Sequence, residues 1–125
     1  FRNWRLCLSV CYDLRFPVWL RNQQDYDALL CVANWPAPRA IAWQALLQAR
    51  AIENQAYCIG VNRVGQDGNR LEYAGGSAVY APDGAEVVLA GSSQRTVTAS
   101  LQASALTALR QTFPVALDAD SFLIR

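Results

Sequence analysis

The feature that most constrains the fold is an unbroken apolar run of strand length, DALLCVAN at residues 27–34. A strand that faces water on one side alternates apolar and polar residues, whereas this run carries no polar residue between its two ends. The run is therefore typical of a strand that is buried on both faces, in the interior of a parallel sheet. Two further apolar segments of strand length, residues 5–11 and 56–64, lie on either side of it in the sequence.

Helical segments are predicted between these strands. Residues 17–22 are expected to form a short helix with Pro17 in its first turn, where the missing N–H costs nothing. Residues 39–55 are rich in Ala, Leu, Gln and Arg and predict a longer helix. Its apolar face is expected to be formed by residues that recur at helical spacing: Ile41, Ala45, Leu46, Ala49 and Ile52. The β-α-β-α-β order with short connections predicts parallel strands and right-handed crossovers.

The pattern changes after the turn sequence GQDGN at residues 65–69. Short strands are expected in the segment that follows, at residues 70–73, 77–80, 86–90 and 95–101. Residues 102–112 predict a helix that Pro114 ends, and the rest, to Arg125, is expected to be an extended tail. With 53% hydrophobic and 17% charged residues, the 125-residue chain is expected to be one packed α/β domain.

Composition narrows the function classes. The net charge of +1 gives no electrostatic reason to expect a nucleic-acid or membrane partner. The apolar runs are shorter than the roughly 20 residues of a bilayer span, and no signal peptide is visible, so a cytoplasmic location is expected. The chain lacks His, which excludes Cys-His and Ser-His mechanisms within it, and it also lacks Lys. Because it also lacks Met, Phe1 is not a natural start and we expect a piece of a longer protein.

The four cysteines differ in their surroundings. Cys7, Cys31 and Cys58 lie inside apolar runs and are expected to be small buried thiols. The spacing of Cys7 and Cys11, with no His to join them, does not favour a zinc site, and no other metal or cofactor is expected. Cys11 stands where an apolar strand ends and charged residues begin.

The position of Cys11 at the end of a strand favours a functional role for its thiol. A residue at the carboxyl end of a parallel strand, before a helix, lies where α/β folds gather their ligands. The backbone N–H of Tyr12 and the following helix start would stabilise a developing oxyanion and lower the pKa of the Cys11 thiol. The alternative is a core cysteine at a strand end, and position alone leaves both interpretations open.

A family resemblance rests on five short sequence motifs that occur in a fixed order: CYDLRFP at 11–17, NWP at 34–36, RAIENQAY at 50–57, NRVG at 62–65 and GGS at 75–77. With them the chain resembles the C-terminal half of the nitrilase superfamily, the carbon–nitrogen hydrolases, over about residues 5 to 122. Among these it looks most like the omega-amidases, which hydrolyse the side-chain amide of 2-oxoglutaramate and 2-oxosuccinamate. CYDLRFP is the most specific of the five motifs.

The resemblance implies a fold and a mechanism. The fold would be half of a four-layer α-β-β-α sandwich, a partial domain spanning residues 1–125 whose N-terminal part is missing. The exposed sheet face of such a half is expected to promote self-association, and the full-length protein is expected to be a homodimer. Cys11 would be the nucleophile that attacks a small-molecule amide, releases ammonia and leaves a thioester for water to hydrolyse.

The family also uses a glutamate base and an oxyanion-stabilising lysine upstream of its cysteine. Only ten residues precede Cys11 and no Lys is present, so the chain alone is expected to be inactive. Two rivals remain: another branch of the superfamily acting on a different amide or nitrile, and a non-catalytic remnant that only folds or associates.

Other positions near the expected site have less certain roles. Arg15 either clamps a substrate carboxylate or pairs with Asp13, which is expected to order the turn through Arg15 or through backbone N–H groups. Asn34 and Trp35 are expected to shape the pocket wall, although plain core packing is the alternative for Trp35. Asn62 is expected mainly to organise the turn into the second half of the fold.

Two further features are expected to be structural. Arg50 and Glu53 are spaced to form an ion pair on one helix face. Gly75 and Gly76 do not open a helix, so they are not expected to bind phosphate.

Overall fold

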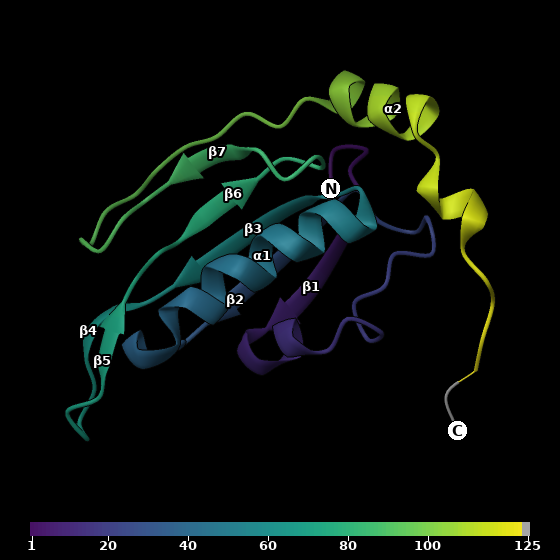
Figure 1. Ribbon diagram of the computed structural model, residues 1–125. Coiled ribbons are helices and arrows are strands. Elements are labelled where there is room, and N and C mark those ends of the chain that lie inside the picture. The colour runs from purple at the N-terminus through teal and green to yellow at the C-terminus, as the bar shows by residue number, and fades with distance from the viewer. Residues whose placement is uncertain (124–125) are drawn as a thin grey trace.

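A single five-stranded sheet organises the computed structural model, which describes residues 1–123 (Figure 1). The strand order is β1-β2-β3-β6-β7. The strands are β1 (Leu6–Val10), β2 (Ala28–Ala33), β3 (Tyr57–Asn62), β6 (Ala78–Tyr80) and β7 (Glu86–Leu89). The first three pair in parallel and the last two join in antiparallel fashion, which confirms the predicted mixed α/β class.

The register of the parallel strands brings their carboxyl ends to one edge. Val10 pairs with Val32, and Ala33 pairs with Asn62. The residues that follow β1 and β2, Cys11 and Asn34, therefore leave the sheet side by side. This edge is where a doubly wound sheet collects its functional groups.

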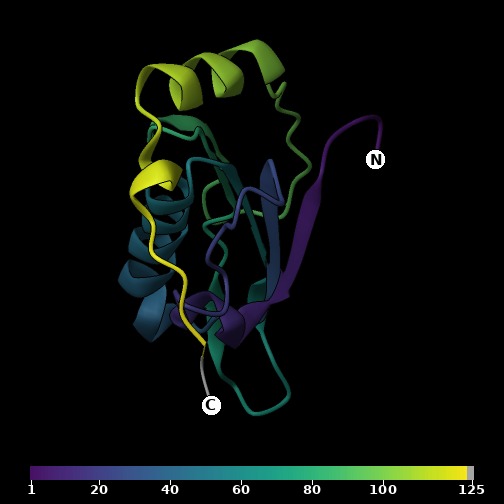
Figure 2. The ribbon, with the colours of Figure 1, turned by 90° about the vertical axis from the view of Figure 1, so that its right-hand side faces the viewer.

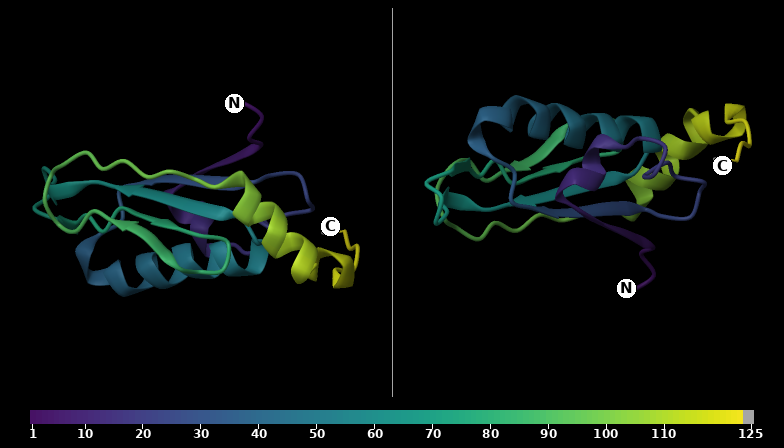
Figure 3. Two further views of the ribbon diagram at one scale, coloured as in Figure 1. Left: turned by 90° about the horizontal axis from the view of Figure 1, so that it is seen from above. Right: turned by 90° about the horizontal axis from the view of Figure 1, so that it is seen from below.

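Helix α1 (Ala40–Asn54) lies along one face of the sheet, as predicted (Figure 3). The predicted apolar face of the helix is wrong: Ile41 is 85% exposed and Ile52 is 51% exposed. The buried residues of the helix are Trp43, Leu47, Arg50, Ala51 and Asn54. The physical reason is that the widest side chain, Trp43, fixes the rotation of the helix, and two polar side chains on the inner face find partners there.

The core between α1 and the sheet is closely packed. It is built from large apolar side chains that are almost fully buried, among them Leu14, Leu20, Leu29, Cys31, Trp35, Trp43, Leu47 and Cys58. Gly60 of β3 lies beneath the helix, and a Cβ there would collide with Leu47 and Trp43. The absence of a side chain at Gly60 thus permits close contact between helix and strand.

The opposite face of the sheet is largely uncovered (Figure 2). Four of its apolar side chains are more than half exposed: Leu8, Val10, Val32 and Val61. Only one end of this face is packed, where Leu106 joins Ala28 and Tyr57 in a small second cluster. This is the face that a half-sandwich was expected to expose.

The predicted helix at residues 17–22 is wrong. A 3-10 helix, η1 (Cys11–Arg15), begins immediately after β1, and a turn and loop lead from it to β2. Side chains replace helical hydrogen bonding in this loop. Asn22 donates from its amide to Tyr26 O and Asn54 O, and its own backbone N–H donates to Asn54 Oδ1. Competition from such local side-chain partners is a common reason why short helices fail to form.

The second half of the chain matches its prediction in part. Strands β4 (Val64–Gln66) and β5 (Glu72–Ala74) form a separate hairpin, and β6 and β7 join the main sheet. The strand predicted at residues 95–101 is wrong, because that mostly exposed segment pairs with no strand of the described chain.

Helix α2 (Ala103–Thr112) is present as predicted. The predicted extended tail is wrong at its start, where the 3-10 helix η3 (Val115–Asp118) forms; its last two residues, 124–125, lie outside the described residues.

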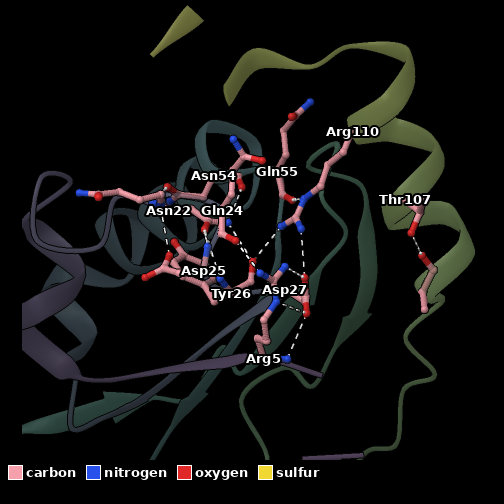
Figure 4. A network of polar contacts seen from close by, with 12 residues as sticks. Arg5, Asn22, Gln24, Asp25, Tyr26, Asp27, Asn54, Gln55, Thr107 and Arg110 are labelled. Atoms are coloured by element: carbon pink, nitrogen blue, oxygen red, sulfur yellow. Dashed lines mark hydrogen bonds and ion pairs between the residues drawn. The ribbon is translucent and has the colours of Figure 1, made fainter. Parts of the chain in front are cut away.

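An arginine–aspartate network fastens α2 to the rest of the molecule (Figure 4). Asp27, just before β2, accepts hydrogen bonds from Arg5 at 2.7 Å and from Arg110 of α2 at 3.0 Å. Arg110 also donates to Tyr26 O and Gln55 O. The hydrogen bond from Arg5, reinforced by Arg110, lowers the pKa of Asp27 to about 2.

Candidate functional site

A cavity of about 410 Å³ opens at the carboxyl edge of the parallel strands. Its walls are formed by Cys11, Tyr12, Arg15, Asn34, Trp35, Pro36 and Arg39. The five residues proposed from the sequence as site residues, Cys11, Tyr12, Arg15, Asn34 and Trp35, all line it. Sequence reasoning missed Arg39. Its position three residues after the NWP motif could have indicated that it lies near the cavity.

A larger cavity, of about 580 Å³, lies at the opposite end of the sheet. It is lined by tail residues and by Arg5 and Arg110, whose charges are already paired with Asp27. No cysteine lines it, so of these two cavities only the smaller one has a thiol in its wall.

Cys11 has an unusual backbone. Its φ is +48°, in the left-handed region that residues with a Cβ rarely adopt. The residue is the first of η1 and directly follows the last residue of β1, so the chain changes direction sharply at the thiol. A strained residue between a strand and a helical turn is the geometry of a nucleophile elbow.

Asp13 holds this turn together. Its carboxylate Oδ2 accepts a hydrogen bond from the backbone N–H of Val10 at 2.9 Å. Of the two roles expected for Asp13, contact with backbone N–H is therefore confirmed. The alternative pairing with Arg15 is wrong, because no ion pair joins the two in the described chain.

Arg15 stacks on Trp35 instead. The guanidinium carbon lies 4.9 Å from the centre of the indole ring, a cation–π arrangement. The guanidinium takes part in no ion pair of the described chain, so its charge remains available to an anion.

Trp35 serves the core and the cavity at once. It is only 3% exposed, and its ring lies 5.6 Å from that of Trp43. Its backbone N–H donates to Asn62 Oδ1 at 2.7 Å, and its carbonyl accepts from Asn62 Nδ2 at 3.0 Å. Its indole N–H donates to the carbonyl of Arg39 at 2.8 Å. Both interpretations offered for Trp35 therefore apply.

Asn62 has a different role from the one predicted. Besides its two bonds to Trp35, its amide donates to Gly75 O at 2.8 Å, which ties the end of β2 to the turn before β6. These bonds hold the loop between β5 and β6 and do not reach the turn at residues 65–69, so the predicted role in that turn is wrong. The contact with Trp35 makes Asn62 a support of the cavity wall.

Arg50 supports the site from beneath. It forms the predicted ion pair with Glu53 at 2.8 Å, and it also donates to Leu14 O of η1 at 2.7 Å. The guanidinium is 4% exposed, so it anchors the turn that carries Cys11 to helix α1.

The other thiols have less reactive environments. Cys31 and Cys58 are buried as predicted, whereas Cys7 is only half-buried because it lies on the edge strand β1. Burial raises the pKa of all three thiols. Each is therefore a weaker nucleophile at neutral pH than an unperturbed cysteine.

Residues 1–123 contain no cluster of three His, Cys, Asp or Glu side chains that could hold a metal ion. Over the same part of the chain, none of the helices is both long and apolar enough to cross a membrane.

Comparisons with known proteins agree with this geometry. The family model for carbon-nitrogen hydrolases matches residues 2–111. The omega-amidase YafV of Escherichia coli K12 is 56% identical over 123 residues, which cover 98% of this chain and 48% of that protein. The 2-oxoglutaramate amidase of Bacillus subtilis is 36% identical over 85% of this chain and 41% of its own length.

A solved structure is also very similar. The CN-hydrolase superfamily protein XC1258 of Xanthomonas campestris, solved with an arsenic adduct in its active site, superposes with a TM-score of 0.97. It is 47% identical, and the match covers 100% of this chain and 50% of that one. The chain thus spans about half the length of the relatives it matches.

Proposed function

The chain belongs to the carbon–nitrogen hydrolase family, and from this premise we propose that it carries the cysteine nucleophile of an omega-amidase. The single observation that carries the proposal is Cys11, held at φ +48° at the end of β1 and lining a cavity with Arg15 and Trp35. The chain turns sharply there, and the residue at the turn contributes a thiol to the cavity wall.

The proposed reaction has two halves. Cys11 Sγ attacks the amide carbon and gives its proton to a base, while the backbone N–H of Tyr12 stabilises the oxyanion. The C–N bond then breaks, the nitrogen takes up a proton and leaves as ammonia, and a thioester remains. Water attacks the thioester, which releases the carboxylic acid and restores the thiol.

The base and a cationic oxyanion donor would come from outside these 125 residues. The chain contains no His and no Lys, and it spans about half of its relatives. For the 125 residues taken alone, these absences favour the alternative of a folded but non-catalytic module. The catalytic proposal therefore concerns the full-length protein in which this chain supplies one half.

Arg15 would set the substrate class. Its guanidinium lies over Trp35 and takes part in no ion pair of the described chain, so it would bind the carboxylate of 2-oxoglutaramate or 2-oxosuccinamate. The printed names of the relatives, omega-amidase and 2-oxoglutaramate amidase, support this substrate over the amides or nitriles of other branches.

The test uses the full-length protein that contains this chain. Ammonia release from 2-oxoglutaramate should be measured for the wild type, Cys11→Ala and Cys58→Ala. We expect turnover in the wild type and in Cys58→Ala, and a loss of at least about a thousandfold in Cys11→Ala. Turnover that survives in Cys11→Ala would refute the proposed nucleophile. A wild type that hydrolyses simple aliphatic amides but not 2-oxoglutaramate would refute the substrate.

A further inference from the structure

The structure points to a second arginine in substrate recognition. We propose that Arg39 acts together with Arg15 as a two-arginine clamp for the carboxylate end of the substrate. This inference rests on the proposed function and deepens it: the clamp would select amides whose far end is anionic over neutral amides.

Arg39 reaches the cavity from a different element. It is the last residue of the 3-10 helix η2 (Ala37–Arg39), immediately before α1. Arg15 is the last residue of η1. Both arginines line the cavity that contains Cys11, so they approach it from the ends of two separate connections in the fold.

Trp35 contacts both arginine residues. Its ring supports the guanidinium of Arg15, and its indole N–H holds the backbone carbonyl of Arg39. Trp35 is itself buried and bonded through its backbone to Asn62. One buried side chain therefore contacts the guanidinium of Arg15 and holds the backbone from which the side chain of Arg39 extends at the cavity.

The charge of the cavity is uncompensated. Its lining contains two arginines and no Asp or Glu. The ion pairs of residues 1–123 use only Arg5, Arg50 and Arg110 among the arginines, so neither Arg15 nor Arg39 is neutralised there. Two guanidinium groups at one cavity repel each other, and a bound carboxylate would remove that repulsion.

The chemistry fits a carboxylate better than a neutral group. A guanidinium donates in a planar fork that matches the two oxygens of a carboxylate, and no ion pair of residues 1–123 occupies that of Arg15. Arg39 is exposed, so its contribution is partly screened by solvent and should be smaller than that of Arg15. Because both lie at the cavity wall and not at the reacting carbon, the clamp should affect binding more than the chemical step.

The test is Arg39→Gln in the full-length protein, with Arg39→Lys beside it. For 2-oxoglutaramate we expect KM to rise about two- to fivefold in Arg39→Gln, with kcat unchanged within error. A neutral aliphatic amide of similar length should show unchanged constants. Arg39→Lys keeps the charge and should recover part of the loss. Arg70→Gln, an equal loss of charge on an exposed turn, is the matched control and should behave as the wild type.

Two further readouts separate this inference from the proposed function. In the wild type, KM for 2-oxoglutaramate should rise with ionic strength, and it should rise less steeply in Arg39→Gln. Calorimetric binding of 2-oxoglutarate, the dicarboxylate product, should weaken about two- to fivefold in Arg39→Gln whether or not turnover is observed.

Unchanged binding of 2-oxoglutarate in Arg39→Gln, or no binding in the wild type, would overturn the clamp. Equal loss on the anionic and the neutral amide would also overturn it and make Arg39 a structural residue. If the wild type binds 2-oxoglutarate through Arg39 but hydrolyses no amide, the proposed function fails and the anion clamp stands.

Discussion

Cys11 combines a reactive side chain with a backbone conformation that few residues tolerate. A residue with a Cβ at φ +48° costs about 1–2 kcal/mol relative to the right-handed region. The surrounding contacts offset this cost: Asp13 binds the N–H of Val10, and Arg50 binds the carbonyl of Leu14. The strain is thus maintained by hydrogen bonds on both sides of the thiol, which keep it at the cavity.

The position of Cys11 predicts the order in which the thiols react. In the full-length protein at neutral pH, iodoacetamide should label Cys11 first. Cys31 and Cys58 are buried, and burial raises the pKa of these two thiols and of Cys7. Peptide mapping by mass spectrometry over a time course gives the order. Labelling of Cys7, Cys31 or Cys58 ahead of Cys11 would contradict it, and an added carboxylate-bearing substrate should slow only the Cys11 reaction.

The contact between α1 and β3 depends on one small residue. Gly60→Ala should lower the free energy of unfolding by about 1–3 kcal/mol, because the added methyl collides with Leu47 and Trp43. Gly68→Ala is the matched control: a Cβ there meets nothing within 4 Å, and the φ of Gly68 is not positive. Thermal melting of both variants of the full-length protein tests this. Equal melting temperatures for the two would show that α1 adjusts freely over the sheet.

The attachment of helix α2 to the rest of the molecule should weaken at acidic pH. Asp27 has its pKa lowered from 3.8 to about 2, first of all by its hydrogen bond from Arg5. Because the folded-state pKa is the lower one, this stabilisation is present above about pH 4 and is lost as the pH falls through about 2. Because solvent screens the half-exposed Arg5, its size is at most roughly 2 kcal/mol.

The variant Asp27→Asn tests this attachment. The difference in free energy of unfolding between it and the wild type should be greatest near pH 6 and shrink from pH 4 downwards. At pH 6 the amides of α2 should exchange faster with deuterium in Asp27→Asn than in the wild type, because Arg110 loses its anionic partner. Asp120→Asn, an exposed carboxylate, should show neither effect. A stability difference that stays constant from pH 6 to pH 3 would mean that the Asp27 charge contributes nothing.

At the scale of elements, the sequence predicted what depends on local pattern. The apolar runs located β1, β2 and β3, and composition located α1 and α2. Which side of α1 faces the sheet was not predictable from its aliphatic residues. Trp43 and the hydrogen bonds of Arg50 and Asn54 decide which side faces inward. The helix predicted at residues 17–22 does not form because Asn22 is bonded to Asn54, which is distant in the sequence. A local sequence pattern does not contain such a contact.

The candidate site was predictable in the two short segments that follow the parallel strands β1 and β2. Cys11 and Asn34 could be brought together because parallel strands end at one edge. Arg39 was missed because its place in the cavity depends on the indole N–H of Trp35, a tertiary contact.

For the whole molecule, one sheet face determines behaviour in solution. Leu8, Val10, Val32 and Val61 are 75%, 61%, 53% and 53% exposed, and they lie on adjacent parallel strands. A contiguous apolar patch of this kind marks an interface. In the full-length protein, we expect the remaining half of the sandwich to cover it.

The 125-residue chain on its own should therefore self-associate. Because it lacks the base and the lysine, it should also release no ammonia from 2-oxoglutaramate above background. Burying the exposed face against another copy removes apolar area from water at roughly 25 cal/mol per Å², and the chain has no other means of covering it. Replacing two central side chains of the face, Leu8→Gln with Val32→Thr, should shift the chain towards monomer without loss of α/β secondary structure. Sedimentation velocity and circular dichroism measure the two properties on the same samples. Ile41→Gln, an 85% exposed apolar residue on the outer side of α1, is the control that should leave association unchanged. If Ile41→Gln instead gives the monomer and the sheet-face variant does not, the association surface is α1, and the sheet face of the isolated chain tolerates water.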